Sequence, residues 1–321
     1  MSGLLLRPFE GGDLVAAGQL LAARHATHRR TQPLLDARYE DPATAQAQVE
    51  QAWASEGASG AVAERDGRAV GYLLGAPKPS PAWGPNVWVE AAGHAVEDPE
   101  VARDLYGLAA SRWVDEGRTA QYVLLPAYDL ALADAWWRVG FGQQHVHAIR
   151  QPADTVVPVR GVRVRRAVRA DIPVLARLDA LLPLQSRRSP VFSAVPLDVL
   201  EERLADWEES FEDPAFTTFV AEVDGAVVGS SIGCAIETSS MHTGLARPDG
   251  AGFLGFAAVL PEARGIGVGR ALGDGVIGWA SDAGYRSVAS DWRATNLLAA
   301  RAWPALGFRP TYLRLHRLVG Y

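Results

Sequence analysis

The stretch VLPEARGIGVGRAL at residues 259–272 decides the fold, because it joins an apolar, strand-like run to a helix through a glycine-rich turn. Gly265, Gly267 and Gly269 carry no Cβ atoms that would keep a ligand away from the backbone. Successive main-chain N–H groups of such a turn converge on phosphate oxygens, and the positive end of the following helix adds to the attraction. We therefore expect this turn to hold a pyrophosphate.

Two other phosphate-binding turns do not fit these residues. A P-loop needs Lys followed by Ser or Thr after its last glycine, but Arg270 and Ala271 stand there. A dinucleotide-binding turn reads G-x-G-x-x-G, whereas here a single residue separates each pair of glycines between Gly265 and Gly269. Arg264 and Arg270 bracket the turn with positive charge. The pattern that remains is R-G-x-G-x-G directly after a strand.

This pattern resembles motif A of the GCN5-related N-acetyltransferases (GNAT), which cradles the pyrophosphate of acetyl-coenzyme A (acetyl-CoA). The likeness continues into SVASDWRATN at 287–296, which is similar to the fifth strand of the family and its terminal Asn296. The signature N-x-x-A-x-x-x-Y-x-x-x-G-F then matches up to Phe308, except that Trp303 replaces the tyrosine. The resemblance covers about residues 160–321.

The resemblance implies that an amine attacks the thioester of acetyl-CoA directly. The strand at 251–260 would then lie beside the pantetheine arm, and a main-chain N–H near Ala258 or Val259 would stabilise the oxyanion. Ten residues are the expected acetyl-CoA contacts: Ala258, Val259, Arg264, Gly265, Ile266, Gly267, Val268, Gly269, Arg270 and Asn296.

The sequence offers several candidates for the residues that transfer protons. An alkyl amine has a pKa of about 10 and is mostly protonated at neutral pH, so a base or a water relay is needed. The strand before the turn carries no carboxylate, which makes Glu237 and Asp291 the candidate bases, although a solvated surface role stays open for each. The family tyrosine that protonates the leaving thiolate is Trp303 here, whose indole is not an acid. Tyr312, Tyr285 or water are the candidate substitutes.

Composition sets broad limits. A chain of 321 residues is long enough for two domains, and 48% hydrophobic with 21% charged residues is typical of a globular protein. The net charge of −6 disfavours a nucleic-acid partner and favours a cationic amine. The sequence contains no apolar run of roughly 18 residues and no export signal, so we expect a cytoplasmic protein without membrane contact. A homodimer stays open.

Cysteine and histidine positions argue against redox or metal chemistry. The single cysteine, Cys234, precludes an intrachain disulfide, and we expect it to be buried in a strand. His145 and His147 lie two residues apart on a predicted strand, but no third ligand follows at a supporting spacing. The same holds for His25 and His28, and we expect surface or cleft positions for all four histidines and no metal site.

The chain also repeats itself. VAERDGRAVG at 62–71 parallels VAEVDGAVVG at 220–229, and LLLRPFEGGDL at 4–14 parallels VRVRRAVRADI at 162–172. Both offsets are 158, because 220 − 62 and 162 − 4 are equal. A period of this length is a whole domain. We therefore expect an α/β protein of the mixed-sheet (α+β) kind, built from two tandem GNAT-like folds.

The two expected domains differ in their chemistry. Their boundaries are 1–152 and 160–321, joined near RQPADTVVPVRG at 150–161, whose prolines suit a connection. In place of the glycine turn, the first half carries HAVEDPEVARDLYGLAA at 94–110, which is acidic and lacks a glycine cluster. Carboxylates there would repel a pyrophosphate. The first domain is therefore expected to be degenerate and to bind no coenzyme A.

The leading hypothesis is an acetyl-CoA-dependent N-acetyltransferase that acts on the amine of a small molecule or a peptide. Because the proton-handling residues are not fixed, a non-catalytic acetyl-CoA sensor or scaffold is the alternative. Transfer to a hydroxyl group, or of a longer acyl chain, also stays open. The segment 181–213 lies where this fold commonly shapes the acceptor site, so we expect specificity to reside there and between the halves.

Overall fold

The computed structural model describes residues 3–153, 158–193 and 196–320, so 154–157 of the expected connection lie outside the described residues. The chain divides into two compact units that are not continuous in sequence. Unit 1 holds the chain up to Val146, the short segment Thr243–Arg247 and the chain from Pro310 onward. Unit 2 holds the stretch from His147 to His242 and the stretch from Pro248 to Arg309.

Unit 1 contains an antiparallel sheet in the order β1-β2-β3-β5 and a second group of strands in the order β4-β6-β13. In the second group, β4 is parallel and β13 antiparallel to β6. Its main elements are β1 (Leu5–Pro8), α1 (Leu14–Thr31), α2 (Pro42–Trp53), β2 (Ser59–Arg65), β3 (Arg68–Gly75), β4 (Asn86–Val89), β5 (His94–Val96), α3 (Pro99–Asp115), β6 (Ala120–Pro126), α4 (Leu130–Arg138) and β13 (Arg309–Leu318).

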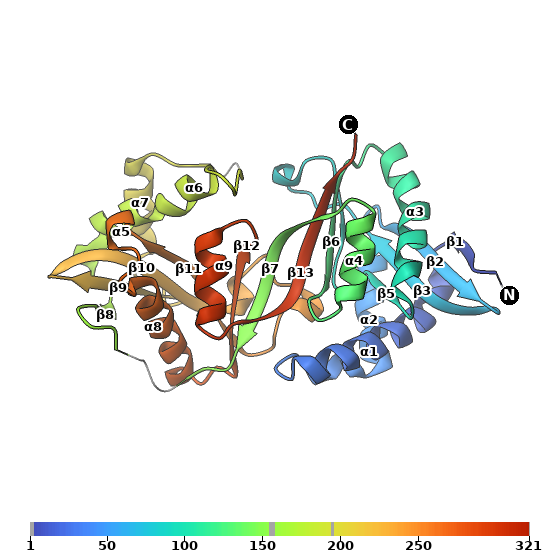
Figure 1. Ribbon diagram of the computed structural model, residues 1–321, viewed down its shortest axis with the longest axis horizontal. Coiled ribbons are helices and arrows are strands. Elements are labelled where there is room, and N and C mark those ends of the chain that lie inside the picture. Colours follow the sequence, from blue (N-terminus) through green and yellow to red (C-terminus); the bar gives the residue numbers. More distant parts are fainter. Residues whose placement is uncertain (1–2, 154–157, 194–195, 321) are drawn as a thin grey trace. The chain divides into compact units, whose positions relative to one another are not determined.

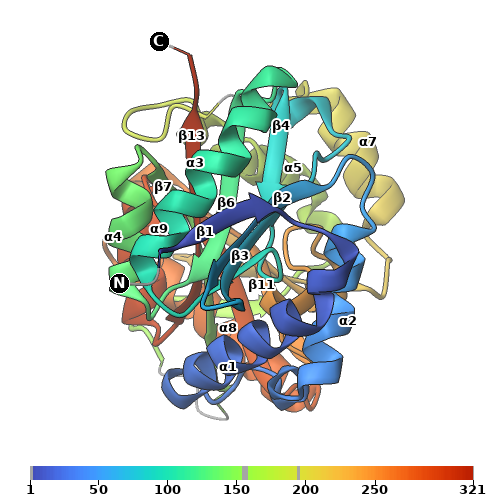
Figure 2. The same cartoon turned by 90° about the vertical axis from the view of Figure 1, so that its right-hand side faces the viewer.

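Helices cover both faces of the first sheet of unit 1 (Figure 2). A Cβ atom on Gly71 of β3 would lie 3.2 Å from Val101 of α3, so this residue faces α3. The next residue, Tyr72, belongs to the core cluster that contains Ala17 and Leu21 of α1. Because successive strand residues point to opposite faces, α1 and α3 lie on opposite sides of β3.

Unit 2 contains a mixed sheet in the order β12-β11-β10-β9-β8, in which β11 and β12 are parallel and the other neighbours are antiparallel (Figure 1). Its main elements are β8 (Arg163–Arg166), α5 (Ile172–Asp179), α6 (Leu181–Ser186), α7 (Leu200–Ser210), β9 (Phe216–Val223), β10 (Ala226–Ala235), β11 (Ala251–Val259), α8 (Val268–Asp282), β12 (Ser287–Arg293) and α9 (Leu297–Ala305). Among the described residues, no helix has the length and hydropathy needed to cross a membrane.

The last strand of each half departs from the expected boundaries at 152 and 160. Strand β7 (Gly142–Arg150) starts in unit 1, but its residues from His147 belong to unit 2. Strand β13, at the end of the second half, belongs to unit 1 from Pro310 onward and pairs with β6 from Tyr312 to Leu318. The repeat gives the order of the elements along the chain, whereas these long-range strand pairings decide which unit each strand joins.

The sequence repeat is visible in the contacts. Arg7 forms an ion pair with Asp13 at 2.5 Å, and 158 residues later Arg165 forms one with Asp171 at 2.6 Å. Each carboxylate also accepts a hydrogen bond at 2.8 Å from the backbone N–H three residues earlier. Both halves therefore fix the connection between their first strand and first helix by the same interaction.

Helix α8 tolerates its several glycines because neighbouring elements approach it closely. A Cβ atom on Gly273 would lie 2.4 Å from Cδ1 of Leu306, and one on Gly275 would lie 3.1 Å from Cγ1 of Val164. The apolar positions Leu272 and Val276 are fully buried. Tertiary packing thus offsets the low helix propensity of glycine, which costs about 1 kcal/mol per residue relative to alanine.

Candidate active site

Unit 2 contains a cleft of about 340 Å³ at the place where β11 and β12 separate. The two strands pair only from Ala251 to Leu254 and from Ser287 to Ser290. The rest of β11 remains paired with β10, so its other edge is left open. Nine of the ten predicted acetyl-CoA contacts line this cleft: Ala258, Val259, Arg264, Gly265, Gly267, Val268, Gly269, Arg270 and Asn296.

The tenth predicted contact, Ile266, is 52% exposed and is not among the residues that line the cleft. Its neighbours Gly265 and Gly267 have φ angles of +83° and +95°, in the left-handed region that favours glycine. Gly267 is the N-cap of α8 and supplies no side-chain capping bond. The first-turn N–H groups of α8 are therefore open to an anion from the cleft.

The equivalent helix start in unit 1 is closed. There, the Asp98 carboxylate accepts a hydrogen bond from the Glu100 N–H at 3.0 Å and caps α3 with negative charge. The neighbouring Glu97 forms an ion pair with Arg68. A side-chain carboxylate thus occupies the position that a phosphate would take at this helix start.

The open edge of β11 presents alternate backbone groups to the cleft. The N–H of Leu260 donates to the Val228 carbonyl at 2.9 Å and so faces β10. Because backbone groups alternate along a strand, the N–H of Ala258 faces β10 as well. The N–H groups of Ala257 and Val259 point the other way, into the separation. Of the two residues predicted near the oxyanion, Val259 is therefore the one whose N–H faces the cleft, and the N–H of Ala257, which also lines the cleft, faces the same way.

Asn296 and Trp303 form the α9 side of the cleft. The Asn296 Oδ1 accepts from the N–H groups of Leu298 at 3.3 Å and Ala299 at 3.5 Å, so it caps α9. Trp303 is 8% exposed and stands, on α9, where the family signature has a tyrosine. Its indole extends the apolar wall of the cleft and supplies no acid.

Asp291 directly follows Ser290, the last β12 residue that pairs with β11, and so lies where the strands separate. Its Oδ2 lies 3.6 Å from Nδ1 of His242, and that nitrogen is 2.9 Å from Oγ of Ser239. The His242 ring is 1% exposed and lies 4.4 Å, between ring centroids, from His147. Sequence reasoning missed His242 and Ser239, which lie in an irregular segment without a motif.

The prediction that Glu237 acts as the base is wrong, because Glu237 lies far from the cleft. Glu237 follows the end of β10, and Ala235 at that end pairs with Gly252 at the start of β11. The cleft lies at the opposite end of β11, so Gly252 and Val259 are separated by roughly 23 Å at the usual rise of a strand. Glu237 is an exposed residue of this far end.

The candidate acids are also misplaced. Tyr312 was expected near the leaving thiolate, but β13 carries it into the core of unit 1, where it is fully buried. Burial raises the pKa of Tyr312 to about 12. Tyr285 follows the C-terminal end of α8, away from the glycine turn, and its ring packs 5.3 Å from Trp279. Neither tyrosine lines the cleft.

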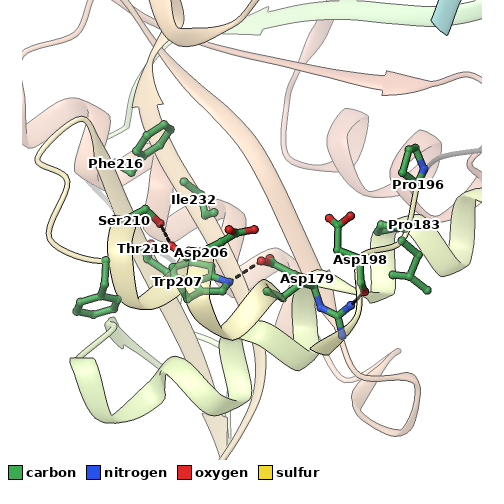
Figure 3. A pocket seen from close by; sticks show the side chains of 13 residues that line it. Asp179, Pro183, Pro196, Asp198, Asp206, Trp207, Ser210, Phe216, Thr218 and Ile232 are labelled. Carbon is green, nitrogen blue, oxygen red and sulfur yellow. Dashed lines mark hydrogen bonds between the residues drawn. The ribbon is translucent and has the colours of Figure 1, made fainter. Parts of the chain in front are cut away.

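A second cavity of unit 2, of about 320 Å³, involves the segment expected to shape the acceptor site (Figure 3). The Asp179 carboxylate accepts a hydrogen bond from the Trp207 indole at 2.5 Å, and burial raises the pKa of Asp179. Asp198 and Asp206 add two more carboxylates. Arg203 is the single basic residue in the lining, and its Nε donates to a backbone carbonyl at 2.7 Å. The cavity is therefore acidic, with an aromatic wall.

The second cavity and the cleft border the same elements. Pro183 of α6 lines the second cavity, and the preceding residue, Leu182, lines the cleft. Ile232 of β10 lines the second cavity and pairs with Phe256, which precedes the cleft residue Ala257. A ligand of the second cavity thus lies beside the wall of the cleft.

Comparisons with known proteins agree with this geometry. Residues 180–308 match the model of the acetyltransferase (GNAT) family. An aminoglycoside N(6')-acetyltransferase type 1 of Stenotrophomonas maltophilia is 35% identical over 118 residues, which are 34% of this chain and 76% of that protein. The chain belongs to the GNAT family. An enzyme of the same description from Salmonella typhimurium is 31% identical over 113 residues, covering 35% of this chain and 74% of that protein.

The GNAT likeness in fold extends over both halves. A crystal structure of a GCN5-related N-acetyltransferase from Sphaerobacter thermophilus matches with a TM-score of 0.54 and 17% identity, over 98% of this chain and 95% of that chain. The expected mixed α/β fold is confirmed. The protein is an N-acetyltransferase of the GNAT type, and membership of this family implies the use of acetyl-CoA.

Proposed function

We propose that this protein transfers the acetyl group of acetyl-CoA to the amino group of a small cationic molecule. One observation carries the proposal: the glycine turn, the uncapped start of α8 and the open edge of β11 meet in one cleft of unit 2. These are a phosphate-binding element and a strand edge that an extended chain can join. The same cleft therefore suits both the pyrophosphate and the pantetheine arm of acetyl-CoA.

The chain's own groups suit each part of the thioester carrier. The N–H groups at the start of α8 bind the pyrophosphate, with Arg264 and Arg270 adding positive charge at the rim. The open edge of β11 receives the pantetheine arm as a neighbouring strand would. The N–H of Ala257 or Val259 then donates to the thioester carbonyl and stabilises the oxyanion as the amine adds.

Asp291 is the base in this proposal, because it lies at the point where the two strands separate. It accepts the proton that the amine loses as the carbon–nitrogen bond forms, directly or through a water molecule. Nδ1 of His242 lies 3.6 Å from the Asp291 carboxylate, and the proposal assigns His242 as a positioning residue. The thiolate of coenzyme A then leaves without an acid from the chain, since a thiol has a pKa of about 8.5.

The acceptor is proposed to be a small molecule with several amino groups. The second cavity holds three carboxylates and one guanidinium, and an ammonium group is attracted both by that charge and by the face of an indole such as Trp207. The curated relatives are described as aminoglycoside acetyltransferases, which supports the same class of acceptor. Transfer to a peptide is the weaker alternative, because no observation on the described residues favours it.

The experiment is an assay of coenzyme A release with a thiol reagent. The purified chain is mixed with acetyl-CoA and with kanamycin, spermidine, glucosamine or a short peptide, and mass spectrometry identifies the acetylated product. We expect release with at least one of the small cationic amines and a product that carries one added acetyl group. Binding of acetyl-CoA without release in the presence of any amine would contradict the proposal and favour a sensor.

A further inference from the structure

Unit 1 contains a cavity of about 570 Å³ that the transfer reaction does not use. Its lining residues come mainly from α1, the end of β5 and the start of α4. Strand β5 pairs with β3, whereas β6 pairs with β4 and β13, so the two groups of strands part beside this cavity. In the internal repeat, the cavity is the counterpart of the cleft in unit 2.

The acidic residues in this cavity are engaged within the protein. Glu97 forms a two-point contact with Arg68, which includes a bond of 2.8 Å. Asp129 is the N-cap of α4, and its Oδ1 accepts from the N–H of Leu132 at 2.9 Å. Much of the remaining lining is apolar and includes Leu20 and Leu130. The cavity therefore has polar and apolar surface in similar amounts, and both carboxylates already accept hydrogen bonds within the protein.

Arg24 is the unusual member of the lining. Its side chain is nine-tenths buried, and its two terminal nitrogens donate to the backbone carbonyls of Ala91, at 2.5 Å, and His94. Its Nε is buried and has no hydrogen-bond partner among the described residues. No carboxylate of the described residues forms an ion pair with it. A buried charge without a counter-charge is costly, so an anion from outside would stabilise this site.

The groups around Arg24 do not balance its charge. Burial, with a further contribution from Arg24, lowers the pKa of both His28 and His94 to about 3. Burial raises the pKa of Tyr128, which lines the cavity and whose ring centroid lies 5.1 Å from that of His28. All three are therefore neutral at pH 7. Of these, Tyr128 lines the cavity and offers its hydroxyl to a ligand, and the guanidinium of Arg24 remains the local positive charge.

We propose that this cavity binds a small organic carboxylate, held by Arg24 at its charged end and by the apolar wall along its body. A planar guanidinium matches a carboxylate in shape and in hydrogen-bonding geometry. One negative charge balances Arg24, whereas a doubly charged phosphate ester would be repelled by the nearby Glu97 and Asp129. This inference does not depend on the acceptor or on the transfer reaction.

The test is calorimetric titration of the full chain with benzoate, with benzamide as a neutral molecule of the same shape, and with inorganic phosphate. We expect benzoate to bind at least tenfold more tightly than either of the others. Equal affinity for benzoate and benzamide would show that charge plays no part and would overturn the proposal. Tighter binding of phosphate would overturn the choice of a carboxylate.

Variants locate the site. Arg24→Gln should weaken benzoate binding at least tenfold, and Ala23→Phe should abolish it, because Ala23 is an exposed helix position whose larger side chain fills the cavity. If Arg24→Gln unfolds unit 1, the Ala23→Phe variant still tests the site, because it leaves Arg24 in place. Arg112→Gln, on the exposed side of α3, should bind benzoate as the unaltered protein does. Unchanged binding in both cavity variants would place the ligand elsewhere.

Discussion

A Cβ atom on Gly267 would lie 2.7 Å from Cγ1 of Val159. The glycine turn therefore packs against the segment that precedes β8, and a side chain at this position would have to displace it. The φ angle of +95° adds a second reason for glycine, because other residues rarely adopt this conformation. Both constraints lie at the start of α8, where the proposed pyrophosphate binds.

Gly267→Ala should weaken acetyl-CoA binding at least tenfold, because the turn must shift to relieve strain and contact. Isothermal titration with acetyl-CoA measures this effect. Gly284→Ala is the matched control, since Gly284 has a φ of +77° beyond the other end of α8 and open space around it. Both variants should lose stability of about 1 kcal/mol, but only the first should lose affinity. Equal affinity in the two variants would remove the turn from the binding site.

Asp291→Asn should lower kcat at least a hundredfold, which is the usual contribution of a general base, while the KM for acetyl-CoA changes less than twofold. His242→Gln should lower kcat by a smaller factor, because it removes the group that positions Asp291. Steady-state kinetics with the best amine of the panel measures both effects. Asp282→Asn, at an exposed position of α8, serves as the control. A kcat unchanged in the Asp291 variant would rule it out as the base.

Asp206→Asn should raise the KM for a cationic acceptor about tenfold and leave the KM for acetyl-CoA unchanged, because it removes one of the three carboxylates of the second cavity. The neighbouring Glu209 lies on the same helix and does not line the cavity, so Glu209→Gln is the matched control. If both variants raise the acceptor KM equally, long-range charge rather than the cavity holds the amine.

The sequence predicted those parts of the site that come from one continuous segment of the chain. The turn from Arg264 to Arg270 needed only its glycine spacing and its place between strand and helix, and the structure brings these residues together with Asn296 in one cleft. Asp291 lies where β11 and β12 separate because the motif fixes the position of its strand, and its role as the base stays a prediction. In each case, a regular element carried the residue to a predictable place.

The wrong predictions concern residues whose positions depend on contacts between segments far apart in the sequence. Tyr312 lies on the last strand, and that strand joins β6 in unit 1, a partner that no local pattern reveals. Glu237 follows a strand whose direction was correct, but the antiparallel pairing puts its end beside Gly252 and far from the cleft. His242 entered the site from an irregular segment, through a contact with Asp291 that only three-dimensional structure shows. His25, His28 and His147, for which the sequence predicts surface or cleft positions, are buried as well.

The ion pair between Arg165 and Asp171 should make stability depend on acid pH. The hydrogen bond from Arg165 holds the pKa of Asp171 below its ordinary value of 3.8, against the opposing effect of burial. Because the pKa is lower in the folded state, this stabilisation is fully present above the unfolded value and is lost as the pH falls through the folded value. Asp171→Asn should therefore cost about 1 to 3 kcal/mol at pH 7 and flatten the loss of stability below about pH 4.

Urea unfolding of the unaltered chain and the variant, repeated between neutral and strongly acidic pH, measures this dependence. Glu212→Gln is the control, because Glu212 is 77% exposed and lies 3.6 Å from Arg169 in a surface pair, so its loss should change stability by less than about 0.5 kcal/mol. The repeat supplies an independent check, since Asp13→Asn removes the equivalent ion pair of unit 1 and should flatten the same acid limb. A variant of Asp171 whose stability falls with acid as steeply as that of the unaltered chain would show that this carboxylate has the same pKa in both states.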